Sequence, residues 1–193
     1  MSSLADDEKK LLLEIARRAL VAAVRGCELP ADVTAKPALS RAAGAFVTLH
    51  KNSKLCGCIG QLPGRESLAD VVAHCAASAA LEDPRFSALR PDELPHVEIE
   101  ISVLSALEDI QPRQIEPGTH GLVVSRGWRR AVLLPQVATQ FNWSSERFLA
   151  ETCEKAGLNP AEWKDPQTRI QAFTAEVFSE ADLNNESARS LRP

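Results

Sequence analysis

The chain has 193 residues, of which 45% are hydrophobic and 25% are charged. These fractions are close to those of soluble globular proteins, so they exclude a disordered chain and predict a single domain with a substantial core over residues 1–193. The formal net charge of −4 provides no overall attraction for nucleic acid or for an anionic membrane. We therefore expect neither as a partner.

Location and redox chemistry follow from the same composition. No apolar run approaches the roughly 20 residues of a membrane-spanning helix, and the first charged residues are acidic, unlike a signal peptide. The five cysteines have no disulfide spacing and no three-cysteine cluster typical of an iron–sulfur centre. We expect a cytoplasmic protein with free thiols, and the sequence indicates no particular cofactor.

The first third of the chain predicts one helix and one β-hairpin. Apolar residues at helical spacing predict a helix over residues 12–23, which ends before Gly26. Two prolines and mixed polarity predict a surface excursion over residues 29–43. Two apolar runs, residues 45–50 and 55–62, are separated by a polar segment of hairpin-loop length and predict two antiparallel strands.

A second helix follows the hairpin. Ser67 is a good N-cap, and apolar residues recur at helical spacing up to residue 82. Because the residue before a proline is pushed away from helical angles, Asp83 and Pro84 should end this helix and present Arg85 from a turn.

The next elements are mainly strands. Residues 97–104 alternate between apolar and polar side chains, which is typical of a half-buried strand. Residues 122–125 and 130–134 predict a second hairpin, and Pro135 suits the first position of a short helix.

The last third combines helices, one strand and a tail. Ser144 caps a further helix that Gly157 closes, and residues 159–162 predict another helix start. Residues 170–178 predict a strand, and the polar tail at 181–193 should fray. Because hairpins outnumber crossover units, we predict an α+β fold with a largely antiparallel sheet and helices packed on it.

Six short segments, in this order, resemble the AMMECR domain family. They are Leu-Cys-Gly-Cys-Ile-Gly at 55–60, Asp-Pro-Arg-Phe at 83–86, Glu-Ile-Glu-Ile-Ser-Val-Leu at 98–104, His-Gly-Leu at 120–122, Leu-Leu-Pro-Gln-Val at 133–137 and Cys-Glu-Lys-Ala-Gly-Leu at 153–158. The resemblance covers about residues 46–178. It implies a two-lobed α+β fold with a cleft between the lobes. In bacteria and archaea the family resembles protein A of the AmmeMemoRadiSam system, which is named for its association with a Memo-type protein and a radical-SAM enzyme.

One position departs from the family pattern, because the family has arginine where this chain has Cys56. If that arginine binds an anion or lowers the pKa of the neighbouring thiol, either role is lost here or passes to another cation, such as Arg85.

Cys58 matches the family motif and is the first candidate catalytic residue. It would act as a nucleophile or an acid–base group, activated by His120 or His74 and served by backbone N–H groups around Gly57 and Gly60. In the alternative interpretation, both cysteines pack as small hydrophobic side chains while the glycines relieve crowding.

The two cysteines are expected to lie together. In an extended strand Cys56 and Cys58 point to the same face, with Cα atoms about 6.6 Å apart, so both thiols would line one pocket. A relaxed disulfide between them would need a bulge. A metal would need further ligands, of which His50 is the nearest in sequence, and we predict no metal site.

The candidate substrate-binding residues are Arg85, Cys56, Gly57, Gly60 and Gln136. A guanidinium presented from a turn can bind a carboxylate or phosphate through two hydrogen bonds. The structural alternative is an arginine that only pairs with the neighbouring Asp83.

Two further groups have both a chemical and a structural interpretation. Glu98 and Glu100 share one strand face, as an acid–base pair or as the solvated side of a half-buried strand. Trp128 stands among arginines at a hairpin tip, which suits nucleic-acid binding, but the negative net charge favours a solvated turn.

Two functional hypotheses remain. In the first, the protein is a cysteine-dependent enzyme or enzyme subunit of an AmmeMemoRadiSam-type system, acting on a small molecule in the interlobe cleft, with Cys58 as the reactive thiol. In the second, it is a non-catalytic adaptor that binds a Memo-like protein or a radical-SAM enzyme.

Overall fold

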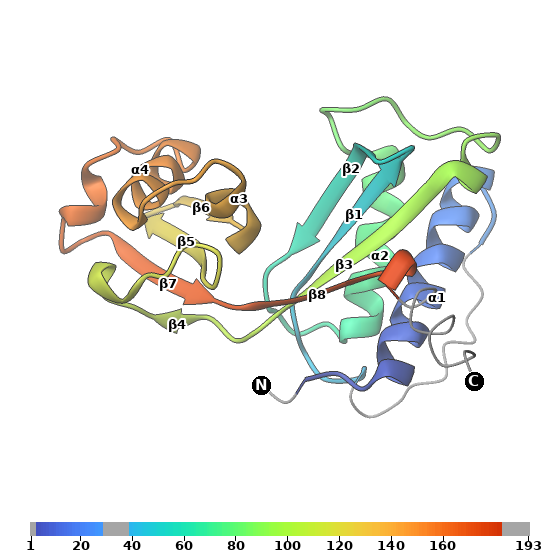
Figure 1. Cartoon of the computed structure of the whole chain (residues 1–193), viewed down its shortest axis with the longest axis horizontal. Coiled ribbons are helices and arrows are strands. Elements are labelled where there is room, and N and C mark those ends of the chain that lie inside the picture. The colour runs from blue at the N-terminus through green and yellow to red at the C-terminus, as the bar shows by residue number, and fades with distance from the viewer. Residues whose placement is uncertain (1–2, 29–38, 183–193) are drawn as a thin grey trace, which may run out of the picture. The chain divides into compact units, whose positions relative to one another are not determined.

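The structure, a computed structural model, describes residues 3–28 and 39–182, which divide into two units (Figure 1). Unit 1 comprises the described residues up to Leu104 and those from Glu176 onward, and unit 2 spans Ser105–Ala175. The elements of unit 1 are α1 (Asp6–Arg25), β1 (Ala45–Lys51), β2 (Lys54–Gln61), α2 (Leu68–Leu81), the 3₁₀ helix η1 (Leu94–His96), β3 (Val97–Leu104) and β8 (Ala175–Ser179).

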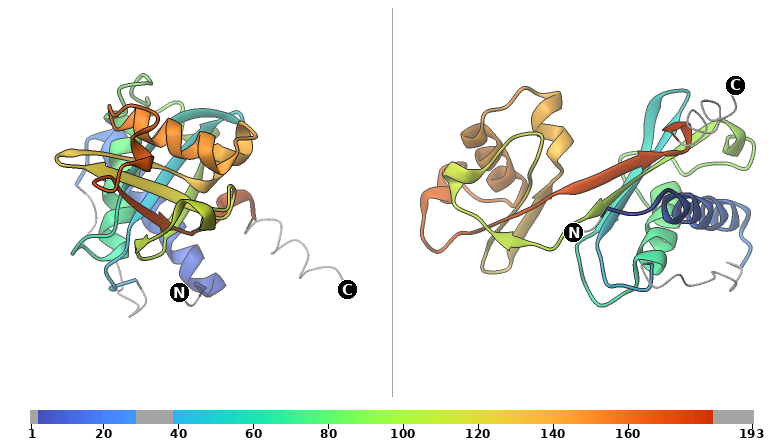
Figure 2. Two further views of the ribbon diagram at one scale, coloured as in Figure 1. Left: turned by 90° about the vertical axis from the view of Figure 1, so that its left-hand side faces the viewer. Right: turned by 60° about the horizontal axis from the view of Figure 1, so that its bottom comes forward.

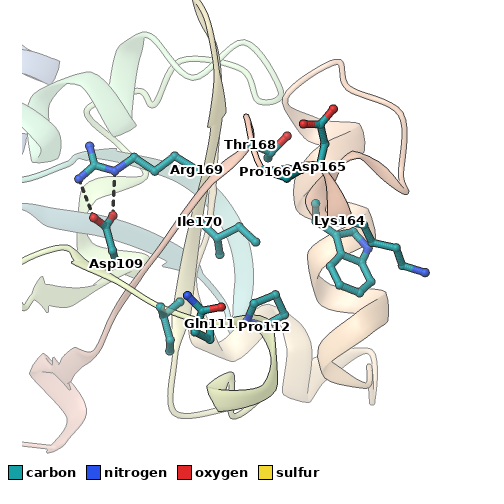
Figure 3. A pocket seen from close by; sticks show the side chains of 11 residues that line it. Asp109, Gln111, Pro112, Lys164, Asp165, Pro166, Thr168, Arg169 and Ile170 are labelled. Carbon is teal, nitrogen blue, oxygen red and sulfur yellow. Dashed lines mark hydrogen bonds and ion pairs between the residues drawn. The ribbon is translucent and has the colours of Figure 1, made fainter.

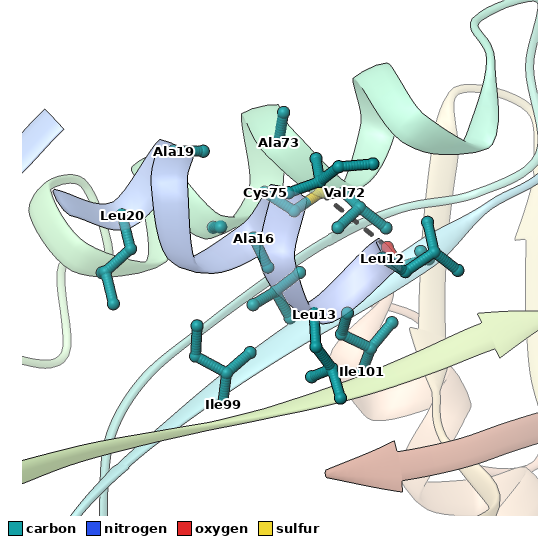
Figure 4. Packing of buried hydrophobic residues seen from close by; sticks show 14 of the residues in the cluster. Leu12, Leu13, Ala16, Ala19, Leu20, Val72, Ala73, Cys75, Ile99 and Ile101 are labelled. Atoms are coloured by element: carbon teal, nitrogen blue, oxygen red, sulfur yellow. Dashed lines mark hydrogen bonds between the residues drawn. The ribbon is translucent and has the colours of Figure 1, made fainter. Parts of the chain in front are cut away.

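The sheet of unit 1 has the strand order β2-β1-β3-β8, and β1 is antiparallel to both β2 and β3. Helices α1 and α2 lie on one face of this sheet (Figure 2). Strand residues alternate between the two faces, and Val47 and Leu49 on β1 are fully buried in the core that the helices cover. Ile99 and Ile101 on β3 are fully buried in the same core, beside the α1 residues shown in Figure 4. The opposite face carries polar residues on the two central strands, among them Thr48 and His50 on β1 and Glu98 and Glu100 on β3.

Helix α2 begins and ends close to where the sequence predicts, whereas α1 ends before Gly26 as predicted but begins at Asp6, six residues before the predicted start at residue 12. Helix α1 ends at Gly26, which adopts a left-handed conformation with φ of 66°. Helix α2 is capped by Ser67, whose hydroxyl accepts a hydrogen bond from the backbone N–H of Asp70. Between the helices, Cys75 is buried and its thiol donates to the carbonyl of Ala45 over 3.8 Å.

The first hairpin is confirmed, and its turn is tight. Asn52 and Ser53 both have positive φ angles, 50° and 62°, as in the turns that match the twist of two-residue hairpins. The pairing register shifts between Leu49 and His50, because Leu49 pairs with Gly57 whereas His50 pairs with Leu55. Cys56 is therefore the extra residue of a β-bulge.

Unit 2 has its own sheet, with the strand order β4-β7-β5-β6. Its core is built around Leu122, Phe148 and Leu149, which are at most 1% exposed. The second predicted hairpin and the helix that Ser144 caps are both present. The elements are β4 (Glu108–Asp109), η2 (Pro112–Gln114), β5 (Gly121–Arg126), β6 (Arg129–Leu133), α3 (Pro135–Gln140), α4 (Ser145–Lys155), η3 (Glu162–Lys164) and β7 (Arg169–Phe173).

The fold is mixed α+β, as predicted, but its strands form two sheets. The strand predicted over residues 170–178 is divided at Thr174 into β7 and β8, which belong to different sheets. Thr174 is held there by Ser105, whose backbone N–H donates to the Thr174 carbonyl and whose hydroxyl accepts from the Thr174 N–H, each over 2.9 Å.

Three other expectations need comment. The predicted helix start at residues 159–162 leads only to the short 3₁₀ helix η3, and the two-residue strand β4 was not predicted. The predicted excursion over residues 29–43 lies largely outside the described residues, as does the predicted tail from residue 183 onward. Among the helices of the described ranges, none is both long and apolar enough to cross a membrane.

Candidate functional site

Cys58 lies on the face of the unit 1 sheet that the helices leave uncovered. Its neighbour Gly57 is buried against α2, so closely that a Cβ atom there would lie 2.1 Å from the Ala79 carbonyl oxygen. Because successive strand residues point to opposite faces, Cys58 points away from α2. The face is partly open, and the Cys58 side chain is neither fully buried nor fully exposed.

Thr48 is a polar neighbour of the Cys58 thiol on this face. The two residues are register partners on β2 and β1, and the Thr48 hydroxyl lies 3.4 Å from the Cys58 sulfur, within hydrogen-bond reach. A hydroxyl that donates to sulfur favours the thiolate over the thiol.

Asp83 and Arg85 hold the backbone of Cys58 at the open edge of β2. The Cys58 N–H donates to the Asp83 carboxylate over 2.9 Å, and Arg85 Nη2 donates to the Cys58 carbonyl over 3.1 Å. Arg85 also donates two hydrogen bonds to Asp83, from Nε to Oδ1 over 2.9 Å and from Nη2 to Oδ2 over 2.7 Å. The pair thus occupies the hydrogen-bonding groups that a further strand would otherwise use.

In the Asp83–Arg85 pair, the carboxylate is buried and the guanidinium side chain is exposed to solvent. The Asp83 side chain is 2% exposed and that of Arg85 is 57% exposed. The hydrogen bond from Arg85 is the main cause that lowers the pKa of Asp83 to about 2. The pKa of Arg85 is raised, chiefly by its hydrogen bond to Asp83 and in smaller part by the negative charge of Asp83. The structural alternative for Arg85, a pair with Asp83, is therefore present, and it brings a cation beside Cys58.

Cys56 does not share the face of Cys58, so the expectation that both thiols line one pocket is wrong. The β-bulge is the reason: His50 pairs with Leu55, which places Leu55 on the face of Cys58 and turns Cys56 away. The Cys56 thiol donates to the carbonyl of Leu49 over 3.3 Å and packs against the helix-covered core. Burial raises the pKa of the Cys56 thiol.

Packing explains the two glycines of the motif. Gly57 admits the backbone of α2, as described above. Gly60 pairs with Phe46, and a Cβ atom at Gly60 would lie 2.1 Å from the Phe46 ring. Gly57 thus allows the close approach of a helix, and Gly60 allows the close approach of an aromatic ring.

Three ionisable residues share the uncovered face with Cys58. They are His50 on β1 and Glu98 and Glu100 on β3. His50 pairs with Glu98, and Glu100 pairs with Thr48. Burial is the main cause that raises the pKa of Glu100. The positive charge of His50 opposes this shift, and the charges of Asp182 and Glu98 add to it. No group of three or more potential metal ligands occurs among residues 3–28 and 39–182.

The sequence did not single out Thr48 or Asp83 as site residues. Thr48 becomes recognisable only once the hairpin register is known, because it is the register partner of Cys58. Asp83 was expected to end a helix and, in the structural alternative, to pair with Arg85. The structural signal that it does more is its burial, at 2% side-chain exposure.

The structure does not bring all predicted site residues into one unit. His120 and Gln136 belong to unit 2, whereas Cys58 and Arg85 belong to unit 1. Nδ1 of His120 accepts a hydrogen bond from the Glu116 N–H over 3.1 Å. His74 is exposed on α2, the helix that covers the opposite face of the sheet from Cys58.

Unit 2 contains two other surface features. A cavity of about 560 Å³ is lined by residues of β4, η3 and β7, including Trp163, Ile170 and the exposed ion pair of Asp109 with Arg169 (Figure 3). Its lining includes none of the predicted site residues. Trp128, at the second hairpin tip, is 88% exposed, and the Arg129 guanidinium lies 5.5 Å from its ring centre.

Comparisons with known proteins agree with this architecture. The family model named AMMECR1 matches residues 13–178. A protein of Methanothermobacter thermautotrophicus is 42% identical over 187 residues, covering 92% of this chain and 96% of the relative. A protein of Saccharolobus solfataricus is 37% identical, covering 95% and 86%. The crystal structure of an uncharacterised protein from Pyrococcus horikoshii matches with a TM-score of 0.83 and 37% identity, covering 92% of this chain and 93% of that one. The chain therefore belongs to the AMMECR1 family.

Proposed function

We propose that the protein uses Cys58 as a reactive thiol on a small electrophilic molecule that carries an anionic group. The observation that carries this proposal is the pair of groups around the thiol. The Thr48 hydroxyl lies 3.4 Å from the sulfur, and the Arg85 guanidinium hydrogen-bonds to the carbonyl of the same cysteine. Both a hydroxyl donor and a nearby cation stabilise a thiolate, which is the nucleophilic form of cysteine.

Arg85 is also the group proposed to hold the substrate anion. Asp83 fixes the plane of the guanidinium through Nε and Nη2, and Nη1 makes no hydrogen bond to the residues that the structure describes. With 57% of its side chain exposed, Arg85 can offer Nη1 to a carboxylate or phosphate.

The biological setting proposed for this chemistry is an AmmeMemoRadiSam-type system, with a Memo-like protein and a radical-SAM enzyme as partners. The support is membership of the AMMECR1 family, whose model matches residues 13–178.

Alkylation with iodoacetamide across pH, with each cysteine peptide followed by mass spectrometry, tests the reactive thiol. We expect Cys58 to be labelled faster at neutral pH than Cys27, which is the exposed reference thiol. Burial raises the pKa of Cys56 and Cys153, and that of Cys75 to about 12, so these three should be labelled slowest.

Two variants make this test specific. Thr48→Val removes the hydroxyl and should slow Cys58 labelling several-fold, whereas Thr48→Ser keeps it and should not. If Cys58 of the unmodified protein is labelled no faster than Cys27, the reactive-thiol proposal is wrong.

A non-catalytic adaptor is the second candidate function. The observation that favours it is Leu55, which is 43% exposed and pairs with His50 on the uncovered face of the sheet. In this alternative, Leu55 is the apolar side chain that the partner would cover, with the polar residues of the same face around it. Co-expression with a Memo-like protein and a radical-SAM enzyme should then give a complex that Leu55→Glu weakens, with Cys58→Ser having no effect.

A further inference from the structure

Three residues form a straight row across the uncovered face of the unit 1 sheet. Cys58 on β2 pairs with Thr48 on β1, and Thr48 pairs with Glu100 on β3. Neighbouring paired residues have Cα atoms about 4.5–5.5 Å apart, so Cys58 and Glu100 are about 10 Å apart at their Cα atoms. Their side chains project to the same side, with only the small Thr48 between them.

The environment of Glu100 suits a proton donor. Its side chain is partly buried, and burial raises its pKa above that of an exposed glutamate. The ionisable groups that act on it are His50 from β1, Glu98 from its own strand and Asp182, which follows β8. A carboxyl group that stays protonated closer to neutral pH can give a proton to a leaving group.

We infer that Glu100 is a second catalytic residue of the Cys58 site, which donates a proton to the leaving group of a substrate that lies across Thr48. This inference rests on the proposed function, because it requires Cys58 to act as the nucleophile. It assigns a substrate class, namely acyl compounds whose leaving group must be protonated to depart.

The chemical step has two halves. The Cys58 thiolate attacks the acyl carbon and forms the C–S bond, the bond from carbon to the leaving oxygen breaks, and that oxygen takes the proton of Glu100. In the second half, the Glu100 carboxylate takes a proton from water, the resulting hydroxide attacks the thioester, and the C–S bond breaks to restore the thiolate.

The test compares two reagents on the whole protein. Iodoacetamide releases iodide, which needs no proton, so it reports only on the thiol. Phenyl acetate releases phenoxide, which is a poorer leaving group than the thiolate, so acetylation of Cys58 should depend on a proton donor. Alkylation is followed by mass spectrometry of the Cys58 peptide. The acetylation rate is followed as the release of phenol in a single turnover, because hydrolysis of the thioester would remove the acetyl group from the peptide.

The informative variant is Glu100→Gln, and the matched control is Glu98→Gln, on the same strand and the same face but in register with His50. We expect Glu100→Gln to slow acetylation at least about tenfold, since general acid catalysis contributes roughly 10²–10⁴-fold. Labelling by iodoacetamide should stay within about twofold, which also shows that the variant is folded around Cys58. Glu98→Gln should leave the iodoacetamide rate unchanged and slow acetylation far less than Glu100→Gln does, because the charge of Glu98 is only a minor cause of the raised pKa of Glu100.

The outcomes separate the two proposals. Three outcomes would each overturn the role of Glu100 and leave the reactive-thiol proposal standing. The first is equal acetylation rates in the unmodified protein and Glu100→Gln, and the second is an equal loss in Glu98→Gln. The third is alkylation of Cys58 without any acetylation. If iodoacetamide labels Cys58 no faster than Cys27, the reactive-thiol proposal fails and this inference fails with it.

Discussion

Asp83 is the residue on which the backbone geometry around Cys58 depends. Its carboxylate accepts the N–H of Cys58 and two hydrogen bonds from the Arg85 side chain, and 2% of its side chain is exposed. A buried acceptor of this kind cannot be replaced by water. The carboxylate therefore has a structural role as well as a role in orienting Arg85.

Asp83→Asn should lower the free energy of unfolding by about 2–3 kcal/mol, which is typical of lost hydrogen bonds to a charged group. The asparagine amide has one acceptor oxygen, so its NH₂ group must face either the Cys58 N–H or the donors of Arg85. Chemical denaturation measures the loss. The control is Asp109→Asn, which breaks the exposed pair with Arg169 and should cost less than about 1 kcal/mol. Equal losses in the two variants would contradict the prediction.

The pH dependence of the same residue has a definite sign. The pKa of Asp83 is lowered from 3.8 to about 2 by folding, so its contribution to stability is fully present above about pH 4. It is lost as the pH falls from about 4 through about 2. The difference in unfolding free energy between the unmodified protein and Asp83→Asn should therefore shrink over that range.

At the scale of elements, the contact of β2 with α2 depends on Gly57. A Cβ atom there would lie 2.1 Å from the Ala79 carbonyl oxygen, which is backbone and cannot rotate away. Gly57→Ala should push the helix from the strand and lower the free energy of unfolding by about 2–4 kcal/mol. Thermal unfolding with Gly64→Ala as the control checks this, because a Cβ atom at Gly64 has no neighbour closer than 3.8 Å. A Gly57→Ala protein as stable as the control would show that α2 shifts without cost.

The hairpin shows why register limits prediction from sequence. Alternation along β2 predicted that Cys56 and Cys58 share a face, and an uninterrupted strand would have placed them so. Cys56 is an extra residue of β2 opposite the consecutive residues Leu49 and His50, and it reverses the alternation, so Leu55 shares the face of Cys58 instead. No residue type in the segment 55–60 indicates a bulge at Cys56.

At the scale of the whole molecule, each unit has a core of its own. The buried cluster of unit 1 includes Leu49 and Ile99, and that of unit 2 includes Phe148 and Leu122. A cavity in one core removes contacts only within that core.

Phe148→Ala should cost unit 2 about 3–5 kcal/mol, because the ring is fully buried. Native-state hydrogen exchange should show faster exchange on β5 and β7, with β1 and β3 unchanged. Leu49→Ala is the matched variant in unit 1 and should reverse the pattern. Equal acceleration in both units after either substitution would show that the two cores unfold as one.

The sequence by itself determined the α+β class, the end of α1, both ends of α2, both hairpins and the family. These properties depend on local signals, such as Ser67 as an N-cap, Gly26 after a helix and the alternation over residues 97–104. The same motif that identifies the family also drew attention to Cys58. Local physical chemistry is sufficient for such predictions because neighbouring residues provide both the signal and the interaction.

Tertiary structure alone decided which residues surround Cys58. Thr48, Asp83 and Glu100 come from three segments that only the strand register and the turn after α2 place around β2. The division of the last predicted strand at Thr174 is of the same kind, because its partner is Ser105. Interactions between residues far apart in sequence depend on pairing and burial, and these leave no signal in the local pattern.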